Sequence, residues 1–224
     1  MRMRSAKALL QGYLEEENWR DHLQAIAQGG MTSVGPLFSF LLKEPTLMHR
    51  SAVALGATCA QLATHTMERA RNVVRRYMWH LSEESGNIGW GIPEAFAETL
   101  AASELLSAEF GRILVTYIID LGREDNYCDN ALLRRSCYWA CGRFAAASPL
   151  QTRMWDKWLA LGLRDTDVIC RGMAAWALSF YPFNPAWRQD LEPLCTRTEE
   201  CLLFDGDHVY TRSVGELAAD LLAS

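Results

Sequence analysis

The sequence has few glycines and prolines, and it lacks an apolar run long enough to cross a bilayer. Its 224 residues include 15 glycines and 7 prolines, which excludes a collagen-like chain. The longest apolar stretch, from Ile113 to Ile119, is interrupted by Thr116 and is far shorter than the roughly 20 residues of a membrane-spanning helix. No long apolar segment follows the basic start at residues 1–4. We therefore expect a cytoplasmic protein without a membrane partner.

Lysine is scarce, and acidic residues outnumber basic ones. The chain has 22 basic and 27 acidic residues and a net charge of −5. The basic residues that are not arginine are Lys7, Lys43 and Lys157. A negative net charge disfavours nucleic acid as a partner, although it does not exclude a local basic face. Half of the residues are hydrophobic and 22% are charged, as expected for a globular protein.

The seven cysteines form no C-x-x-C pair, and their number is odd. Both features argue against a disulfide framework. Cys137 and Cys141 are four residues apart, so on a helix they would share one face and could bind a metal together. No histidine or second cysteine pair lies near them at ligand spacing. The sequence therefore predicts buried free thiols, and we expect no metal and no cofactor.

The composition and the periodicity both favour helices. Alanine and leucine are abundant, and both have high helix propensity and low strand propensity. No sustained period-two stretch indicates a strand, so the sequence predicts an all-α fold and a single domain over residues 1–224. One helix is predicted from Ser5 to Ala27, where Gly29 and Gly30 follow it. Asp165 and Asp207 are predicted to cap two later helices.

Four segments share a pattern, in which an apolar residue stands three positions before an arginine and a small residue follows it. These segments are Leu47–Gly56, Leu132–Cys141, Val168–Ala177 and Val209–Ala218. Their small residues would let neighbouring helices approach closely. Each arginine is expected to bond a carbonyl or carboxylate of the preceding repeat. We therefore predict a structural role for Arg50, Arg135, Arg171 and Arg212.

The pattern resembles HEAT-like repeats, including those first described in phycobilisome lyases. The resemblance covers residues 46–62 and the chain from residue 130 to its C-terminus. It implies a right-handed α-α superhelix, a HEAT or armadillo-like solenoid of about five or six helical hairpins with an extended concave surface. Because such arrays mostly bind proteins, it also implies a non-enzymatic scaffold with a protein or peptide partner.

The segment from Trp79 to Phe96 departs from this pattern. Gly86, Gly89 and Gly91 permit a tight loop, and Pro93 predicts the first turn of a following helix. The segment resembles a signature of uncharacterised bacterial HEAT-repeat proteins, in which a Trp-rich helix ends in Glu-Ser-Gly and a Gly-Trp-x-x-Pro-Glu element opens the next. Its acidic and aromatic side chains favour a cationic or amide-bearing partner. The predicted contacts are Trp79, His80, Glu83, Glu84, Trp90 and Glu94.

Two other functions stay open at this point. His80 and Glu84 are four residues apart and could form an acid–base pair, in a small-molecule or lyase-type enzyme with its site at the Glu84–Glu94 loop. Arg69, Arg71, Arg75 and Arg76 could present a cationic stripe to phosphates, with Arg71 and Arg75 as the tested contacts, in a nucleic-acid-binding protein related to the HEAT-like alkylpurine DNA glycosylases. The chain has no convincing match to the Trp and Asp active-site pattern of those glycosylases. No catalytic residue is therefore assigned.

Overall fold

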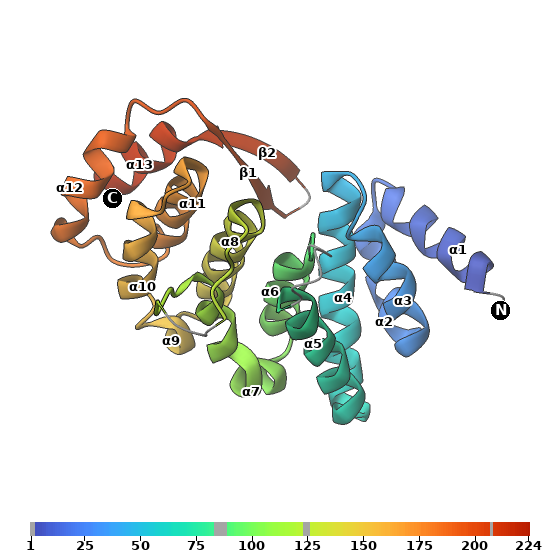
Figure 1. The fold of residues 1–224 in the computed structure, drawn as a ribbon. Helices are drawn as coiled ribbons and strands as arrows, with labels where there is room; N and C mark the ends of the chain where they lie inside the picture. The colour runs from blue at the N-terminus through green and yellow to red at the C-terminus, as the bar shows by residue number, and fades with distance from the viewer. Residues whose placement is uncertain (1–2, 83–88, 123–125, 207) are drawn as a thin grey trace. The chain divides into compact units, whose positions relative to one another are not determined.

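A computed structural model describes residues 3–82, 89–122, 126–206 and 208–224. Over these residues the protein is mostly helical, with thirteen α-helices and one two-stranded sheet, consistent with the predicted all-α class. The chain forms two compact units, Met1–Gly111 and Arg112–Ser224. Figure 1 shows the order of the elements along the chain.

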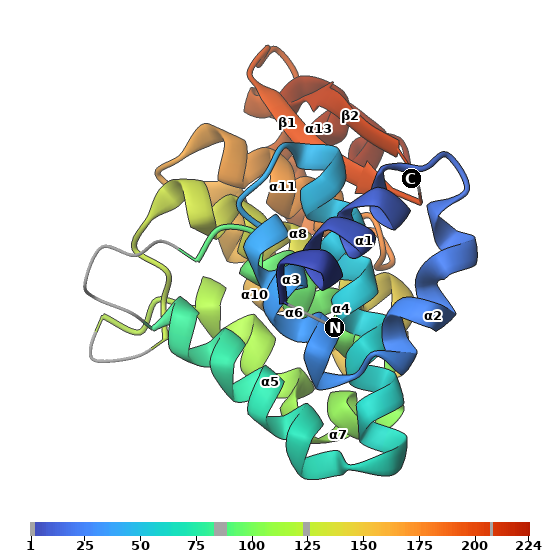
Figure 2. The same ribbon diagram turned by 90° about the vertical axis from the view of Figure 1, so that its right-hand side faces the viewer.

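The first unit consists of helices, among which the long helix α4 contacts most of the others. The elements are α1 (Met3–Glu15), the 3₁₀ helix η1 (Trp19–His22), α2 (Leu23–Gln28), α3 (Met31–Phe40), α4 (Pro45–His65), α5 (Met67–Leu81), α6 (Ile92–Ala102) and α7 (Glu104–Leu114), which extends past the end of the unit. In Figure 2, α1 and α3 lie beside α4, and both contact it.

The predicted continuous helix from Ser5 to Ala27 is wrong, because α1 ends at Glu15. Arg50 Nη1 in α4 donates hydrogen bonds to the carbonyl oxygens of Leu14, at 2.6 Å, and Glu16, at 3.0 Å. These carbonyls lie where the helix ends and lack helical partners, so a cation satisfies them well. Arg50 thus bonds the carbonyls of a preceding helix, as predicted for the repeat arginines.

The close contact between α4 and α6 depends on a glycine, Gly56, which has no Cβ atom. A Cβ atom at Gly56 would lie 2.7 Å from the carbonyl oxygen of Glu98, well inside van der Waals contact. Gly56 is the small residue six positions after Arg50 in the repeat pattern. The prediction that these small residues allow close helix approach is confirmed at this position.

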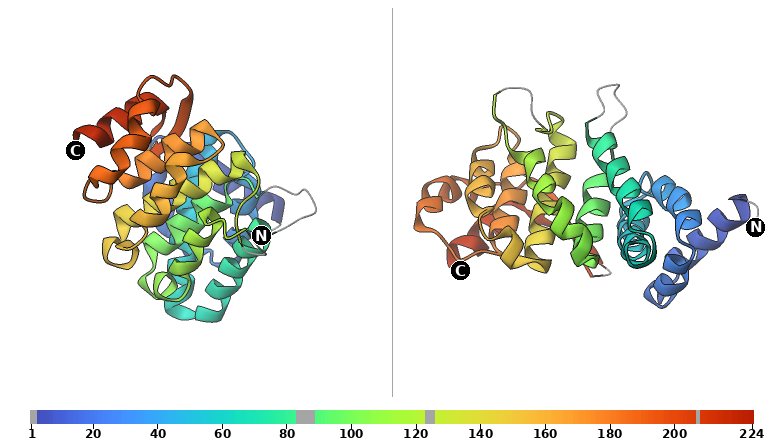
Figure 3. Two further views of the ribbon diagram at one scale, coloured as in Figure 1. Left: turned by 60° about the vertical axis from the view of Figure 1, so that its left-hand side comes forward. Right: turned by 90° about the horizontal axis from the view of Figure 1, so that it is seen from below.

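The second unit combines short helices with one β-hairpin. Its elements are η2 (Val115–Ile118), α8 (Ala131–Ala147), α9 (Pro149–Thr152), α10 (Asp156–Leu161), η3 (Gly162–Arg164), α11 (Val168–Leu178), η4 (Pro185–Trp187), α12 (Arg188–Leu191), η5 (Glu192–Leu194), β1 (Glu200–Asp205), β2 (His208–Ser213) and α13 (Val214–Ala223). Figure 3 shows α8, α10 and α11 side by side, and α11 contacts both of the others.

The hairpin corrects the prediction that no strand is present. Strands β1 and β2 pair antiparallel, from Glu200 opposite Ser213 to Asp205 opposite His208. Val209, Tyr210 and Thr211 favour a strand over a helix. The Phe204 ring packs edge-on against Trp139 of α8, with ring centroids 5.5 Å apart. Strand propensity and burial of one face therefore override the helical pattern there.

The repeat arginines of the second unit bond differently from the prediction. Arg135 in α8 reaches forward to Asp167, and Arg171 donates to the carbonyl oxygen of Asp165 in the turn before its own helix. Arg212 lies in β2 rather than in a helix and pairs with Asp220 of α13 at 2.9 Å. None of the three bonds a preceding repeat in these contacts.

The predicted caps shift as well. Asp167, not Asp165, caps α11, because its side chain accepts the hydrogen bond of the Cys170 amide at 2.8 Å. Ser213 caps α13 in a reciprocal arrangement with Glu216, and Asp207 lies outside the described residues. The sequence placed a cap near each helix but missed its position, because several polar residues precede both helices.

Candidate functional site

A pocket of about 220 Å³ lies in the first unit, between α3, α5 and the residues that lead into α6. Its described lining residues are Gly35, Phe38, Ser39, Leu42, Arg76, His80, Gly89, Trp90 and Ile92. We call it the Arg76–Trp90 pocket. Two of the residues predicted as partner contacts, His80 and Trp90, therefore lie in one pocket, although they belong to different elements.

Aromatic packing holds α3, α5 and α6 together behind the pocket. The buried ring of Tyr77 stacks on Phe38, with centroids 5.3 Å apart, and lies 5.9 Å from Phe96 of α6. The Tyr77 hydroxyl lies 3.3 Å from Thr99 Oγ1 and 3.8 Å from Cys59 Sγ. Burial raises the pKa of Tyr77 well above its usual range and raises the pKa of Cys59 to about 11. Both groups are therefore uncharged at neutral pH.

Arg76 brings a positive charge to this apolar wall. Its guanidinium carbon lies 3.9 Å from the centroid of the Phe38 ring, in the range of a cation–π contact. The side chain is on the exposed face of α5. Among the described residues, no carboxylate lies within ion-pair distance of Arg76, and no described lining residue is acidic.

Exposed apolar side chains lie at the pocket and next to it. Leu42 is 66% exposed and Trp90 is 38% exposed, and both line the pocket. Trp79 is 59% exposed and packs edge-on against the His80 ring, with centroids 5.1 Å apart. The His80 ring in turn lies 6.0 Å from the Phe38 ring. Exposed apolar side chains gathered around a concave site often mark a binding surface.

The acidic residues predicted as contacts do not join this pocket in the described structure. Glu94 is 3% exposed, near the start of α6, and is not among the described lining residues. Glu83 and Glu84 lie outside the described residues. The predicted helix start is confirmed: Gly91, at φ +71°, precedes α6 and Pro93 lies in its first turn.

Arg71 and Arg75, two of the four arginines proposed to bind phosphates, are engaged with carboxylates. Arg71 Nε lies 3.0 Å from each carboxylate oxygen of Glu109. Arg75 Nη1 donates to Glu68 at 2.5 Å and to Asn72 at 2.8 Å. Each guanidinium therefore has an acceptor within the protein and presents less free charge to a phosphate.

Phe38, Leu42 and Ile92 were not predicted as members of the site, and Arg76 was predicted only as part of a cationic stripe. One signal was available, because Arg76 and His80 are four residues apart and so share a face of α5. Phe38 and Leu42 come from another part of the chain. No local pattern relates them to α5, since only tertiary packing brings them there.

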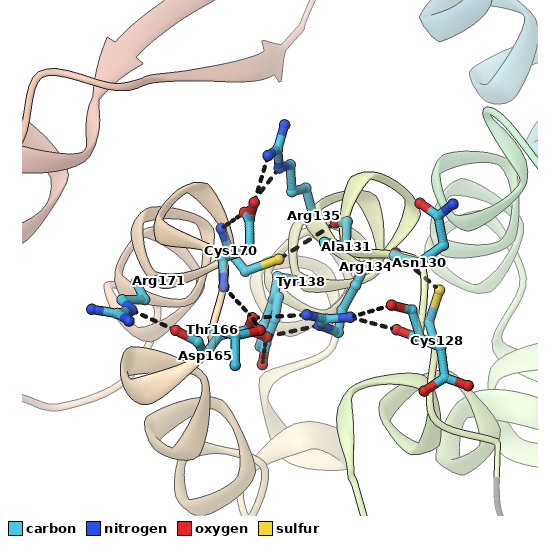
Figure 4. A network of polar contacts seen from close by, with 12 residues as sticks. Cys128, Asn130, Ala131, Arg134, Arg135, Tyr138, Asp165, Thr166, Cys170 and Arg171 are labelled. Atoms are coloured by element: carbon cyan, nitrogen blue, oxygen red, sulfur yellow. Dashed lines mark hydrogen bonds and ion pairs between the residues drawn. The ribbon is translucent and has the colours of Figure 1, made fainter.

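The second unit holds a different polar cluster, which is buried (Figure 4). Arg134 and Asp165 form a bidentate ion pair, in which the Nε–Oδ2 and Nη2–Oδ1 distances are both 2.8 Å. Each of the two side chains is 3% exposed. Arg134 Nη1 also donates to the carbonyl oxygens of Cys128 and Asp129, at 2.7 and 3.0 Å. Its guanidinium lies 5.0 Å from the Tyr127 ring centroid. All of these bonds are internal.

The carboxylates of this cluster are held in their charged form. Burial alone would raise the pKa of Asp165, but the hydrogen bonds from Arg134 and the Asp167 amide outweigh it and lower the pKa. For Asp167, burial is likewise outweighed by the bonds from Arg135 and the Cys170 amide, and its pKa falls to about 2. The cluster connects α8 to the start of α11, so we assign it a structural role in stabilising the fold.

Comparison with known proteins gives no assignment. Neither the family models nor the curated proteins contain a match to this chain. Within the described residues, no group of three or more potential ligand side chains could hold a metal ion, and no helix has both the length and the apolarity needed to cross a membrane.

Proposed function

We propose that this chain is a HEAT-like helical-repeat protein that acts as a non-enzymatic binding module for a protein or peptide. The observation that carries the proposal is the Arg76–Trp90 pocket, with its apolar wall and exposed aromatic rim. Its volume of about 220 Å³ is below the roughly 300–1,000 Å³ of typical small-molecule sites. A pocket of this size suits one or two side chains of a partner.

Further support comes from the position of Trp90. Interface energy is concentrated in a few residues, with tryptophan, tyrosine and arginine enriched among them. The pocket presents Trp90 and Arg76 within one small site. The enzyme alternative has less support, because Glu94 is buried and is not among the described lining residues of the pocket. The nucleic-acid alternative is weakened by the carboxylate partners of Arg71 and Arg75.

The test is selection of binding peptides from a random display library, followed by affinity measurements on purified variants. We expect the selected peptides to lose about tenfold or more in affinity with Trp90→Ala, since a buried aromatic anchor contributes about 2 kcal/mol or more. Phe180→Ala is the matched control, because Phe180 is 39% exposed and lies in the second unit. Failure to enrich any peptide, or equal losses in the two variants, would contradict the proposal.

A further inference from the structure

We infer that the Arg76–Trp90 pocket recognises the C-terminal residue of a peptide: an apolar side chain enters the pocket, and the terminal carboxylate pairs with Arg76. This inference rests on the proposed function and specifies its ligand. It also reverses the sign of the charge expected from the sequence, which favoured a cationic partner because Glu83, Glu84 and Glu94 are acidic. The described lining of the pocket contains a cation and no acid.

The orientation of Arg76 leaves its donors available. The guanidinium carbon lies over the face of the Phe38 ring, 3.9 Å from the centroid. A guanidinium directs its N–H groups outward in its own plane, so contact with a ring face does not consume them. Among the described residues, Arg76 donates no hydrogen bond to the protein. A planar fork of this kind matches the two oxygens of a carboxylate.

The surrounding arginines provide an internal comparison. Arg71 and Arg75 lie on the same helix and already pair with Glu109 and Glu68. A ligand carboxylate would have to displace those partners, whereas at Arg76 it displaces water. Phe38 is 7% exposed, so it gives the guanidinium an apolar face on one side. Charge pairing is stronger there than in bulk water.

The size of the pocket favours a terminal residue over an internal acidic one. In a C-terminal residue, the apolar side chain and the carboxylate are attached to the same Cα atom. One residue can therefore fill the pocket of about 220 Å³ and still reach Arg76, which lines it. An internal aspartate or glutamate would need a second residue to supply the apolar group, which requires more space.

The experiment uses octapeptides that end in leucine, synthesised with either a free C-terminal carboxylate or a C-terminal amide. A third peptide has an internal aspartate beside leucine and an amidated end. A fourth is amidated and carries arginine beside leucine. Binding to the full chain is followed by the fluorescence of Trp90, with Trp90→Phe as the signal control. We expect the free carboxylate peptide to bind about tenfold or more tightly than the other three, since each of them lacks the terminal carboxylate that would accept hydrogen bonds from Arg76.

Variants of α5 assign that preference to one side chain. Arg76→Gln is expected to abolish the difference in affinity between the carboxylate peptide and the amide peptide. Arg76→Lys should keep part of the preference for the carboxylate peptide, because lysine retains the charge but not the planar guanidinium. Arg75→Gln is the matched control and should keep the full preference for the carboxylate peptide. Thermal unfolding of each variant checks that the fold is intact, and an exposed position such as 76 should tolerate the change.

The outcomes separate this inference from the proposed function. If carboxylate and amide peptides bind equally and Trp90→Ala weakens both, the binding function stands and the carboxylate specificity is refuted. Equal binding of the internal aspartate peptide refutes recognition of the terminus, and preference for the arginine peptide refutes the sign of the charge. If none of the four peptides binds, the inference is refuted, and the proposed function is decided separately by whether the display library yields any binding peptide.

Discussion

In the second unit Arg134 is 3% exposed and donates to Asp165 and to two backbone carbonyls, whereas in the first unit Arg76 lies exposed on the Phe38 ring. The residue type is the same, and the surroundings decide its role. An arginine whose donors are used internally stabilises the fold but has little to offer a ligand. An arginine placed on an aromatic ring at the edge of a pocket keeps its donors for a partner.

The largest expected effect comes from breaking the buried pair. Asp165→Asn leaves the Arg134 charge buried without its partner, so the free energy of unfolding should fall by about 3–5 kcal/mol. Asp190→Asn is the matched control, because Asp190 pairs with Arg164, whose side chain is 61% exposed. It should cost less than about 1 kcal/mol. Urea denaturation of both variants measures the free energies of unfolding. Equal losses in the two variants would show that the buried cluster does not stabilise the fold more than a surface ion pair does.

The next effect tests packing in the first unit. Gly56→Ala places a Cβ atom 2.7 Å from the Glu98 carbonyl oxygen, so α4 and α6 must separate and stability should fall by about 1–3 kcal/mol. Gly12→Ala provides the opposite case, since a Cβ atom there meets nothing within 4 Å. That helical position should gain up to about 1 kcal/mol. Thermal unfolding compares the two, and a neutral Gly56→Ala would contradict the close helix contact.

A smaller effect concerns acid stability in the second unit. The pKa of Asp167 is about 2 in the folded protein, below its ordinary 3.8. The ionised Asp167 side chain therefore contributes fully to the free energy of unfolding above its ordinary pKa. This contribution is lost as the pH falls through the pKa of the folded protein. Asp167→Asn should lose about 1–2 kcal/mol at neutral pH and flatten the decline in stability between about pH 4 and 2. Asparagine also caps helices well, so the change removes the charge and the Oδ2 hydrogen bond from Arg135 while the cap to the Cys170 amide can remain.

The smallest effect is expected at the exposed pairs of α5. Arg71→Ala removes the contacts with Glu109 and Glu68, where the side chains are between 36% and 59% exposed. Surface pairs contribute about 0–1 kcal/mol, and salt screens them. At low salt, the free energy of unfolding of Arg71→Ala should therefore be slightly below that of the wild type. Denaturation at high salt should show no such difference. A loss above about 2 kcal/mol would mean that this pair resembles the buried one.

Local chemistry in the sequence predicted much of the fold. The helical composition, Gly91 and Pro93 at the start of α6, and the small residue Gly56 correspond to features of the structure. The hairpin was missed, although Gly206, at φ +54°, directly follows β1 and lies between two strand-favouring segments, and glycine is typical of hairpin turns. The arginine pattern favoured a helix there, and Arg212 instead lies in β2. A degenerate repeat pattern is therefore a weak guide where strand propensity competes.

The candidate site was less predictable than the fold. Trp90 and His80 stood out because the surrounding segment departs from the repeat pattern. Arg76 was hidden among neighbouring arginines, and only its contact with Phe38 of α3 distinguishes it from Arg71 and Arg75. That contact depends on how three helices pack around Tyr77. A single sequence does not contain that information in any local pattern.

The most direct test follows arginine side-chain Nε–H signals by nuclear magnetic resonance while a leucine-ended peptide with a free carboxylate is added. The account predicts that the Arg76 and Trp90 side-chain signals move together and saturate at the same peptide concentration, while the Arg134 signal stays fixed. Movement at Arg134 with Arg76 and Trp90 unchanged would contradict it, because the arginine with its donors bonded inside the protein would then be the one that meets the ligand.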